Sequence, residues 1–166
     1  MLFRSQENAL SGIVFTGSAR GHAKGNTSTY NLENGIEVRD EARPHLEQNR
    51  CTDNGCDGIR YKNQSGGSAV SNKASSNTQY GITVRERAHP RLEGNECEAN
   101  KESGVGWFGQ AGGLAKANRC NMNELHGIFV CEQATPTLEE NQCEGDRKST
   151  RLNSSHSQQS RMPSSA

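Results

Sequence analysis

The residues best suited to bind a ligand in this chain recur at a spacing of 23. Arg39, Lys62 and Arg85 follow one another at that interval, and Phe108 comes 23 residues later. If residues 23 apart stack about 4.8 Å above one another, they form a stripe of three cations and an aromatic ring. Such a stripe could bind an acidic polysaccharide through several weak contacts, which salt would screen. The alternative is an ordinary solvated strand face, because acidic residues such as Glu37 lie nearby.

Carboxylates and cations share a second series of positions at the same spacing. The series is Lys24, Glu47, Val70, Glu93, Lys116 and Glu139. Glu47 and Glu93 would lie two intervals apart, about 9.6 Å, near the separation of the two carboxylates that hydrolyse a glycosidic bond. The lysines favour a neutralised surface ladder instead, in which each exposed pair adds little stability. We therefore expect no catalytic residue in this series.

Two histidines, His22 and His45, also lie 23 residues apart, and His89 follows nearby, two intervals further on. A pair of histidines can begin a metal site, but zinc needs three or four ligands and the sequence suggests no third. We therefore expect surface residues in turns and no metal site. The sequence contains no phosphate-binding loop, no Ser-His-Asp order and no dinucleotide fingerprint, so no cofactor is expected.

All these series belong to one repeat of 23 residues. Each unit opens with a glycine, at Gly12, Gly35, Gly58, Gly81, Gly104 and Gly127. Fourteen residues later comes an asparagine, at Asn26, Asn49, Asn72, Asn95, Asn118 and Asn141. A second asparagine series runs from Asn31 to Asn123, nineteen residues after each glycine. A fixed period without insertions predicts a solenoid. Because Asn tolerates left-handed backbone and stacked Asn side chains can hydrogen-bond, we expect turns and structural ladders at these positions.

Three short extended runs fit into each unit: Gly-Ile-x-Val, then Pro-x-Leu-Glu or Gly-x-Ala-x, then a triplet around a cysteine position. A second period of 46 residues lies on the first. Where the second run carries Leu, as at Leu92, the first carries Val84; where it carries Ala, as at Ala115, the first carries an aromatic such as Trp107. This pairing of large with small side chains predicts a tube of constant packing density, with Trp107 in the core.

Four of the six cysteines share one position of the repeat, sixteen residues after its glycine: Cys51, Cys97, Cys120 and Cys143. Ser28 and Ala74 occupy the same position, so we expect small buried side chains there. The spacing of neighbouring cysteines permits a disulfide without requiring one.

The repeats GITVRERAHPRLEGNECEAN and GVGWFGQAGGLAKANRCNMN resemble right-handed parallel β-helix repeats, which are found beside carbohydrate-active domains and in pectate lyases. The resemblance implies an all-β solenoid of about six coils, acting as a non-catalytic scaffold or as a binding module for carbohydrate. The alternative is a polysaccharide lyase, hydrolase or epimerase whose active coils lie outside this stretch. Lyases of the family use clustered carboxylates for calcium and a basic residue for proton abstraction. No such cluster maps onto this sequence, so no catalytic residue is carried over.

The composition limits the classes of partner. Leu, Ile, Val and Phe make up only 24 of the 166 residues, but they fall at fixed positions of the repeat, so we expect a folded chain. Nineteen basic residues balance nineteen acidic ones, which gives no general attraction to nucleic acid or to an anionic membrane. The partners we expect are therefore an acidic polysaccharide or another protein.

The repeat divides the chain into three parts. Residues 1–11 are interpreted as part of a preceding coil, residues 12–145 as the β-helix, and residues 146–166 as a disordered tail. The tail resembles a translated sequencing-library adapter, and we interpret it as non-native. Without caps at its ends, the solenoid is expected to be a fragment of a longer protein.

Overall fold

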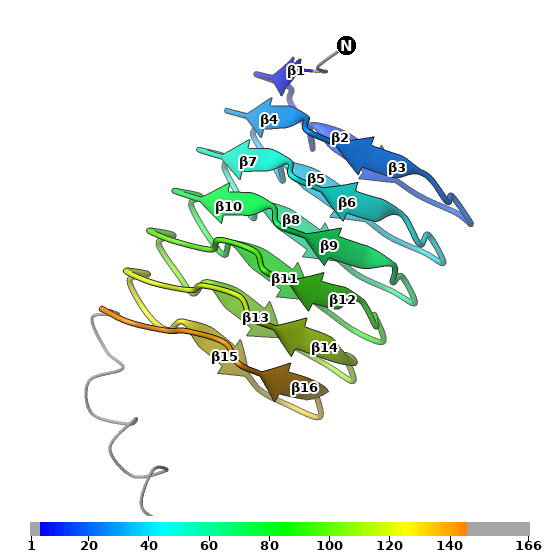
Figure 1. The fold of residues 1–166 in the computed structure, drawn as a ribbon. Helices are drawn as coiled ribbons and strands as arrows, with labels where there is room; N and C mark the ends of the chain where they lie inside the picture. Colours follow the sequence, from blue (N-terminus) through cyan, green and yellow to red (C-terminus); the bar gives the residue numbers. More distant parts are fainter. Residues whose placement is uncertain (1–3, 146–166) are drawn as a thin grey trace, which may run out of the picture.

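The computed structural model describes residues 4–145 and shows a stack of flat coils, each of which adds one strand to two or three parallel sheets (Figure 1). Sheet 1 contains β2 (Ile13–Phe15), β5 (Ile36–Val38), β8 (Ile59–Tyr61), β11 (Ile82–Val84), β13 (Val105–Trp107) and β15 (Ile128–Val130). Sheet 2 contains β3 (His22–Lys24), β6 (His45–Glu47), β9 (Ser68–Val70), β12 (Arg91–Glu93), β14 (Gly112–Lys116) and β16 (Thr135–Glu139). Sheet 3 contains β1 (Arg4–Gln6), β4 (Thr27–Thr29), β7 (Arg50–Thr52) and β10 (Lys73–Ser75).

The register of the strands reproduces the sequence period. Every strand pair is parallel and joins residues 23 apart, as Ile36 with Ile59 in sheet 1 and His22 with His45 in sheet 2. Beyond β10, sheet 3 continues only as single bridges from Lys73 through Glu96 and Arg119 to Gln142. The predicted all-β solenoid of about six coils is confirmed. No helix in residues 4–145 is long and apolar enough to cross a bilayer.

Both asparagine series form ladders. In the first series, each side-chain amide donates to Oδ1 of the next asparagine at 2.8–3.0 Å, as Asn72 Nδ2 does to Asn95. Asn72 Nδ2 also donates to the Leu46 carbonyl, and Asn72 Oδ1 accepts from the backbone N–H of Asn49. The second series begins at Asn8 and repeats the pattern. Buried polar groups need hydrogen-bond partners, and the ladders supply these partners to the buried asparagines.

The left-handed backbone lies one residue earlier than predicted. None of the ladder asparagines has a positive φ; the residue before each one does, including Gln48, Ser71 and Ala117. The expectation that asparagine itself takes this conformation was therefore wrong. The physical reason is that the asparagine must direct both its N–H and its amide at the next coil. The reversal of the chain therefore falls on the preceding residue, at a cost of about 1 kcal/mol for a residue other than glycine.

The interior is filled as the pairing of large with small residues predicts. Trp107 and Tyr61 are fully buried opposite the runs that carry Ala115 and Ala69, and all four belong to one hydrophobic cluster. Cys51, Cys97 and Cys120 are also fully buried, and burial raises the pKa of the Cys51 thiol to about 12. They therefore behave as small hydrophobic residues.

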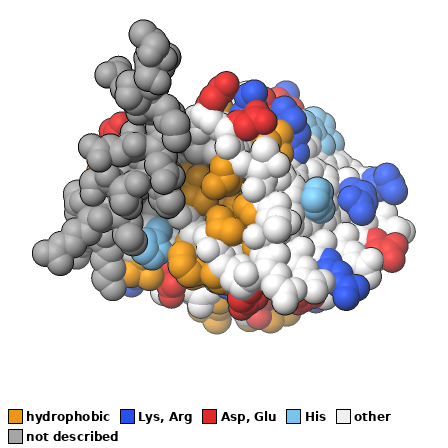
Figure 2. Space-filling model, turned by 90° about the horizontal axis from the view of Figure 1, so that it is seen from below, with side chains coloured by type: hydrophobic (Ala, Val, Ile, Leu, Met, Phe, Trp, Pro, Cys, Tyr) orange, Lys and Arg blue, Asp and Glu red, His pale blue; other side chains and the backbone are white. Residues whose placement is uncertain are grey.

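The core is less covered in the last described coil. Val130 is 39% exposed and Leu138 is 47% exposed. Seen from below, hydrophobic side chains gather in the middle of the visible face (Figure 2). The residues predicted as a tail, 146–166, lie outside the part that the structure describes.

Candidate binding surface

The predicted stripe is assembled along one edge of sheet 1. Arg39, Lys62, Arg85 and Phe108 each follow a strand, and each backbone N–H donates to the coil before it at 2.9–3.0 Å. The four residues therefore stack in register. Their function as a ligand site stays a prediction.

Two of these cations converge on one carboxylate. Lys62 Nζ lies 3.0 Å from Glu37 Oε1, and an Arg39 guanidinium nitrogen lies 3.7 Å from the same atom. The Glu37 side chain is only 7% exposed, and its other oxygen accepts hydrogen bonds from Ser11 and Asn34. Burial alone would raise the pKa of Glu37, but the interactions with Lys62, Ser11 and Arg39 together outweigh it and lower that pKa. Both cations are therefore already engaged, although one carboxylate offsets only one of their two positive charges.

The aromatic end of the stripe is also occupied. The Arg85 guanidinium carbon lies 4.5 Å from the centre of the Phe108 ring and 6.0 Å from that of Tyr80. Tyr80 meets Phe108 edge-on at 5.5 Å, and Phe129 lies 5.8 Å beyond. Sequence reasoning missed this cluster. The residue that could have indicated it is Gly106. A Cβ at that position would lie 2.6 Å from the Phe108 ring, so a larger residue would not leave room for the ring.

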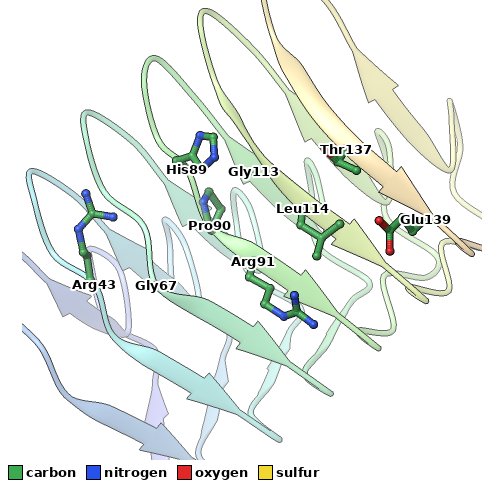
Figure 3. Close-up of a pocket in the computed structure, with 9 residues that line it drawn as sticks. All are labelled: Arg43, Gly67, His89, Pro90, Arg91, Gly113, Leu114, Thr137 and Glu139. Carbon is green, nitrogen blue, oxygen red and sulfur yellow. The ribbon is translucent and has the colours of Figure 1, made fainter.

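A groove runs across the outer face of sheet 2, with a volume of about 670 Å³ (Figure 3). Its lining residues come from successive coils: Arg43, Gly67, His89, Pro90, Arg91, Gly113, Leu114, Thr137 and Glu139. Figure 3 shows Arg43 at one end and Thr137 with Glu139 at the other. The groove therefore follows the axis of the solenoid.

Glycines line the groove at every second coil, where the backbone of the preceding coil approaches closely. Gly67 and Gly113 have φ values of 91° and 121°, and a Cβ at either would lie 2.1–2.2 Å from the carbonyl oxygen of Pro44 or Pro90. Only glycine fits there. Sequence reasoning noted the alternation of Gly with Pro in a 46-residue period but not that these glycines line one groove.

The lining of the groove is mostly basic at one end. Arg43 and His89 are exposed, and no described residue forms an ion pair with Arg43. Arg91 binds Glu93, with Nη2 at 2.6 Å from the carboxylate. Leu114 adds an apolar side chain, and Glu139 accepts from Lys116 at 3.1 Å. The arrangement offers hydrogen-bond donors around a hollow with room for an extended ligand.

The series of carboxylates and lysines forms the neutralised ladder that was predicted. Lys24 Nζ lies 2.7 Å from Glu47, and Lys116 Nζ lies 3.1 Å from Glu139. Each carboxylate of this series has a cationic partner, because Glu93 is bound by Arg91. The geometry gives no support to a hydrolytic pair.

The histidines differ from the prediction. His22 and His45 lie in strands β3 and β6, not in turns, and the Glu47 carboxylate, which the sequence analysis did not connect with them, lies close to both rings. Glu47 Oε2 is 3.2 Å from His22 Nε2 and 3.6 Å from His45 Nε2. Alternation in a strand places residues 45 and 47 on one face, which was the signal available. The Lys24 ammonium, followed by His22, lowers the pKa of Glu47, so this carboxyl is ionised at neutral pH.

Comparison with known proteins agrees with this architecture. The family described as "Right handed beta helix region" matches residues 11–161. Searches of curated proteins and of solved structures found no significant match to the chain. Because the family match covers well over half of the sequence, the chain belongs to the right-handed β-helix family.

Proposed function

We propose that this β-helix is a binding module whose groove on sheet 2 holds a segment of an acidic polysaccharide without turning it over. The observation that carries the proposal is the groove itself, which Gly67 and Gly113 line and which Arg43, His89 and Arg91 border. Coils stack at about 4.8 Å, so the two glycines lie about 9.6 Å apart along the axis. A linear ligand lying along that axis would meet a glycine at each such step, with different side chains around each one.

The polarity of the lining supports an anionic ligand. Arginine can donate two parallel hydrogen bonds to a carboxylate, and a sugar acid presents such a group at regular intervals. Arg43 is exposed and has no ion-pair partner among the described residues. Binding of an anionic ligand to Arg43 would therefore not require an existing ion pair to break. Binding would be weak at each contact and would gain strength from several contacts together.

The stripe of Arg39, Lys62, Arg85 and Phe108 is the second candidate surface for the same ligand. Its support is the stacking of the four residues in register along the axis. We place it after the groove, because Glu37 already engages two of its cations and Arg85 covers a face of Phe108.

The test is calorimetric titration of polygalacturonate into the full chain at low salt, with a neutral glucan as control. Arg43→Ala/Arg91→Ala should weaken binding roughly tenfold, since two exposed contacts of about 0.7 kcal/mol each are lost. Leu114→Trp, which fills the hollow but removes no charge, should also abolish most of the binding. An intact far-ultraviolet spectrum would show that both variants keep their fold.

The matched control is Arg39→Ala/Lys62→Ala/Arg85→Ala, which changes the stripe alone. Loss of binding in this triple variant, with the groove variants unaffected, would move the site to the stripe. No binding by the wild-type chain at low salt would refute both surfaces. Release of unsaturated or reducing-end sugar during the titration would instead favour a lyase, hydrolase or epimerase.

A further inference from the structure

Three potential metal ligands meet on sheet 2, two coils away from the centre of the groove. His22 projects from β3, while His45 and Glu47 project from β6, its neighbour. One ligand atom from each of the three lies within 4.8 Å of the other two. The imidazole rings are 4.7 Å apart, tilted by 50°, and both direct Nε2 at Glu47 Oε2.

The separations fit a tetrahedral ion. Bonds of about 2.0–2.1 Å at tetrahedral angles place neighbouring ligand atoms about 3.3 Å apart, whereas six-coordinate geometry places them about 2.9–3.0 Å apart. The two distances from the imidazole nitrogens to Oε2 are 3.2 Å and 3.6 Å. The third separation, between the two histidine nitrogens, is at most 4.8 Å, and rotation of the half-exposed rings would have to shorten it.

The atoms that would not bind the ion already have partners. His45 Nδ1 lies 2.5 Å from Ser68 Oγ on β9, so the ring turns its other nitrogen toward Glu47. Lys24 Nζ donates to Glu47 Oε1 at 2.7 Å, which leaves Oε2 on the side of the histidines. Partners of this kind fix the orientation of metal ligands in known sites.

We propose that His22, His45 and Glu47 form a site for zinc or a similar divalent transition metal ion, with a fourth position open to water. Two imidazoles and one carboxylate suit zinc, whereas calcium and magnesium prefer ligand sets made of oxygen alone. The ligands come from two consecutive coils, so a bound ion would cross-link β3 to β6. Lys24 would oppose the ion, which limits the affinity.

The first test is calorimetric titration of zinc into the full chain, together with cobalt absorption spectra. We expect one ion per chain. His22→Ala and Glu47→Gln should each weaken binding at least tenfold, and Ser68→Ala about tenfold, as loss of an outer partner does at known sites. His126→Ala is the control, because this histidine lies outside both the cluster and the groove.

Lys24→Met gives the most specific readout. Removing a unit charge about 5 Å from a divalent ion should tighten binding roughly tenfold, even at the dielectric constant of water. A site made elsewhere in the chain would not respond.

The cobalt spectrum separates this site from the six cysteines. A tetrahedral site of nitrogen and oxygen shows visible bands without a thiolate charge-transfer band. Thiolate absorption at one equivalent, unchanged affinity in His22→Ala and Glu47→Gln, or no binding below millimolar zinc would each overturn the proposal.

Discussion

The pairing of Trp107 with Ala115 inside one coil leads to a quantitative prediction. Both side chains are fully buried in the same cluster, while the preceding coil fills the equivalent positions with Val84 and Leu92. The chain itself therefore shows that a Val–Leu layer fits the same tube. Replacing Trp107 and Ala115 together by Val and Leu should therefore change the free energy of unfolding little. Either substitution alone should lower it.

The magnitudes follow from the two opposite packing errors. Trp107→Val opens a cavity and should cost about 2–4 kcal/mol of unfolding free energy. The indole Nε1 is buried without a hydrogen-bond partner among the described residues, which favours the lower end of that range. Ala115→Leu alone overfills the layer and should cost about 1–3 kcal/mol. The double variant conserves volume and should cost less than about 1.5 kcal/mol.

The assay is denaturant unfolding followed by far-ultraviolet circular dichroism, because Trp107 is the only tryptophan and its fluorescence is lost. The control pairs Trp107→Val with Ala69→Leu, two coils away, where the effects should add. If Trp107→Val and Ala115→Leu were also simply additive, the two residues would not share a packing layer and the reasoning would fail.

Three further predictions concern polar groups of the solenoid. Tyr61→Phe should stabilise the fold by about 1 kcal/mol in the same assay, because it removes a buried hydroxyl that has no partner in the described part of the chain; a loss of stability would contradict this. Asn72→Ala should cost about 3–4 kcal/mol, since four ladder hydrogen bonds are lost, whereas the partly exposed Asn63→Ala should cost under about 1 kcal/mol. The pKa of Glu37 is lowered in the fold because its interactions with Lys62, Ser11 and Arg39 together outweigh burial, so its stabilisation is present above the ordinary value of 4.5 and is lost as pH falls through the lower folded pKa. Glu37→Gln should therefore flatten the acid limb of a stability-against-pH curve, and an unchanged limb would exclude this carboxylate as a contributor.

The sequence was sufficient to predict the register of the strands, because a fixed period of 23 residues allows only one alignment of neighbouring coils. If Ile36 stacks on Ile59, every other residue of the two coils is aligned as well, including both asparagine ladders. The backbone turn was misplaced by one residue because propensity was given more weight than geometry. Gln48 and Ala117 take the left-handed conformation despite their side chains, since the asparagine that follows must face its ladder.

The surface was harder to predict. A series of residues spaced by 23 shows which side chains stack on one another, but it does not show contacts between residues of different series. Lys62 and Arg39 were predicted correctly as neighbours, and Glu37 was named as an acid near them, but the sequence did not show that this one carboxylate is almost buried and contacts both. Glu47 was assigned to a ladder with Lys24, and its contact with His22 was missed. That contact was missed because each series of positions was considered by itself.

Constant packing inside and variable chemistry outside explain how sheet 2 can carry both the groove and the histidine cluster. One outward series of positions on this sheet runs from His22 and His45 through Ser68 and Arg91 to Leu114 and Thr137, and its chemistry changes at every coil after the first two. The inward residues between these positions stay apolar, so changes in the outward column need not disturb the core. A ligand that lies along the axis would therefore meet imidazole, hydroxyl, guanidinium and aliphatic groups in order, about 4.8 Å apart. In a solenoid, such an ordered column is the simplest way for a repeated sequence to acquire a surface that is not repeated.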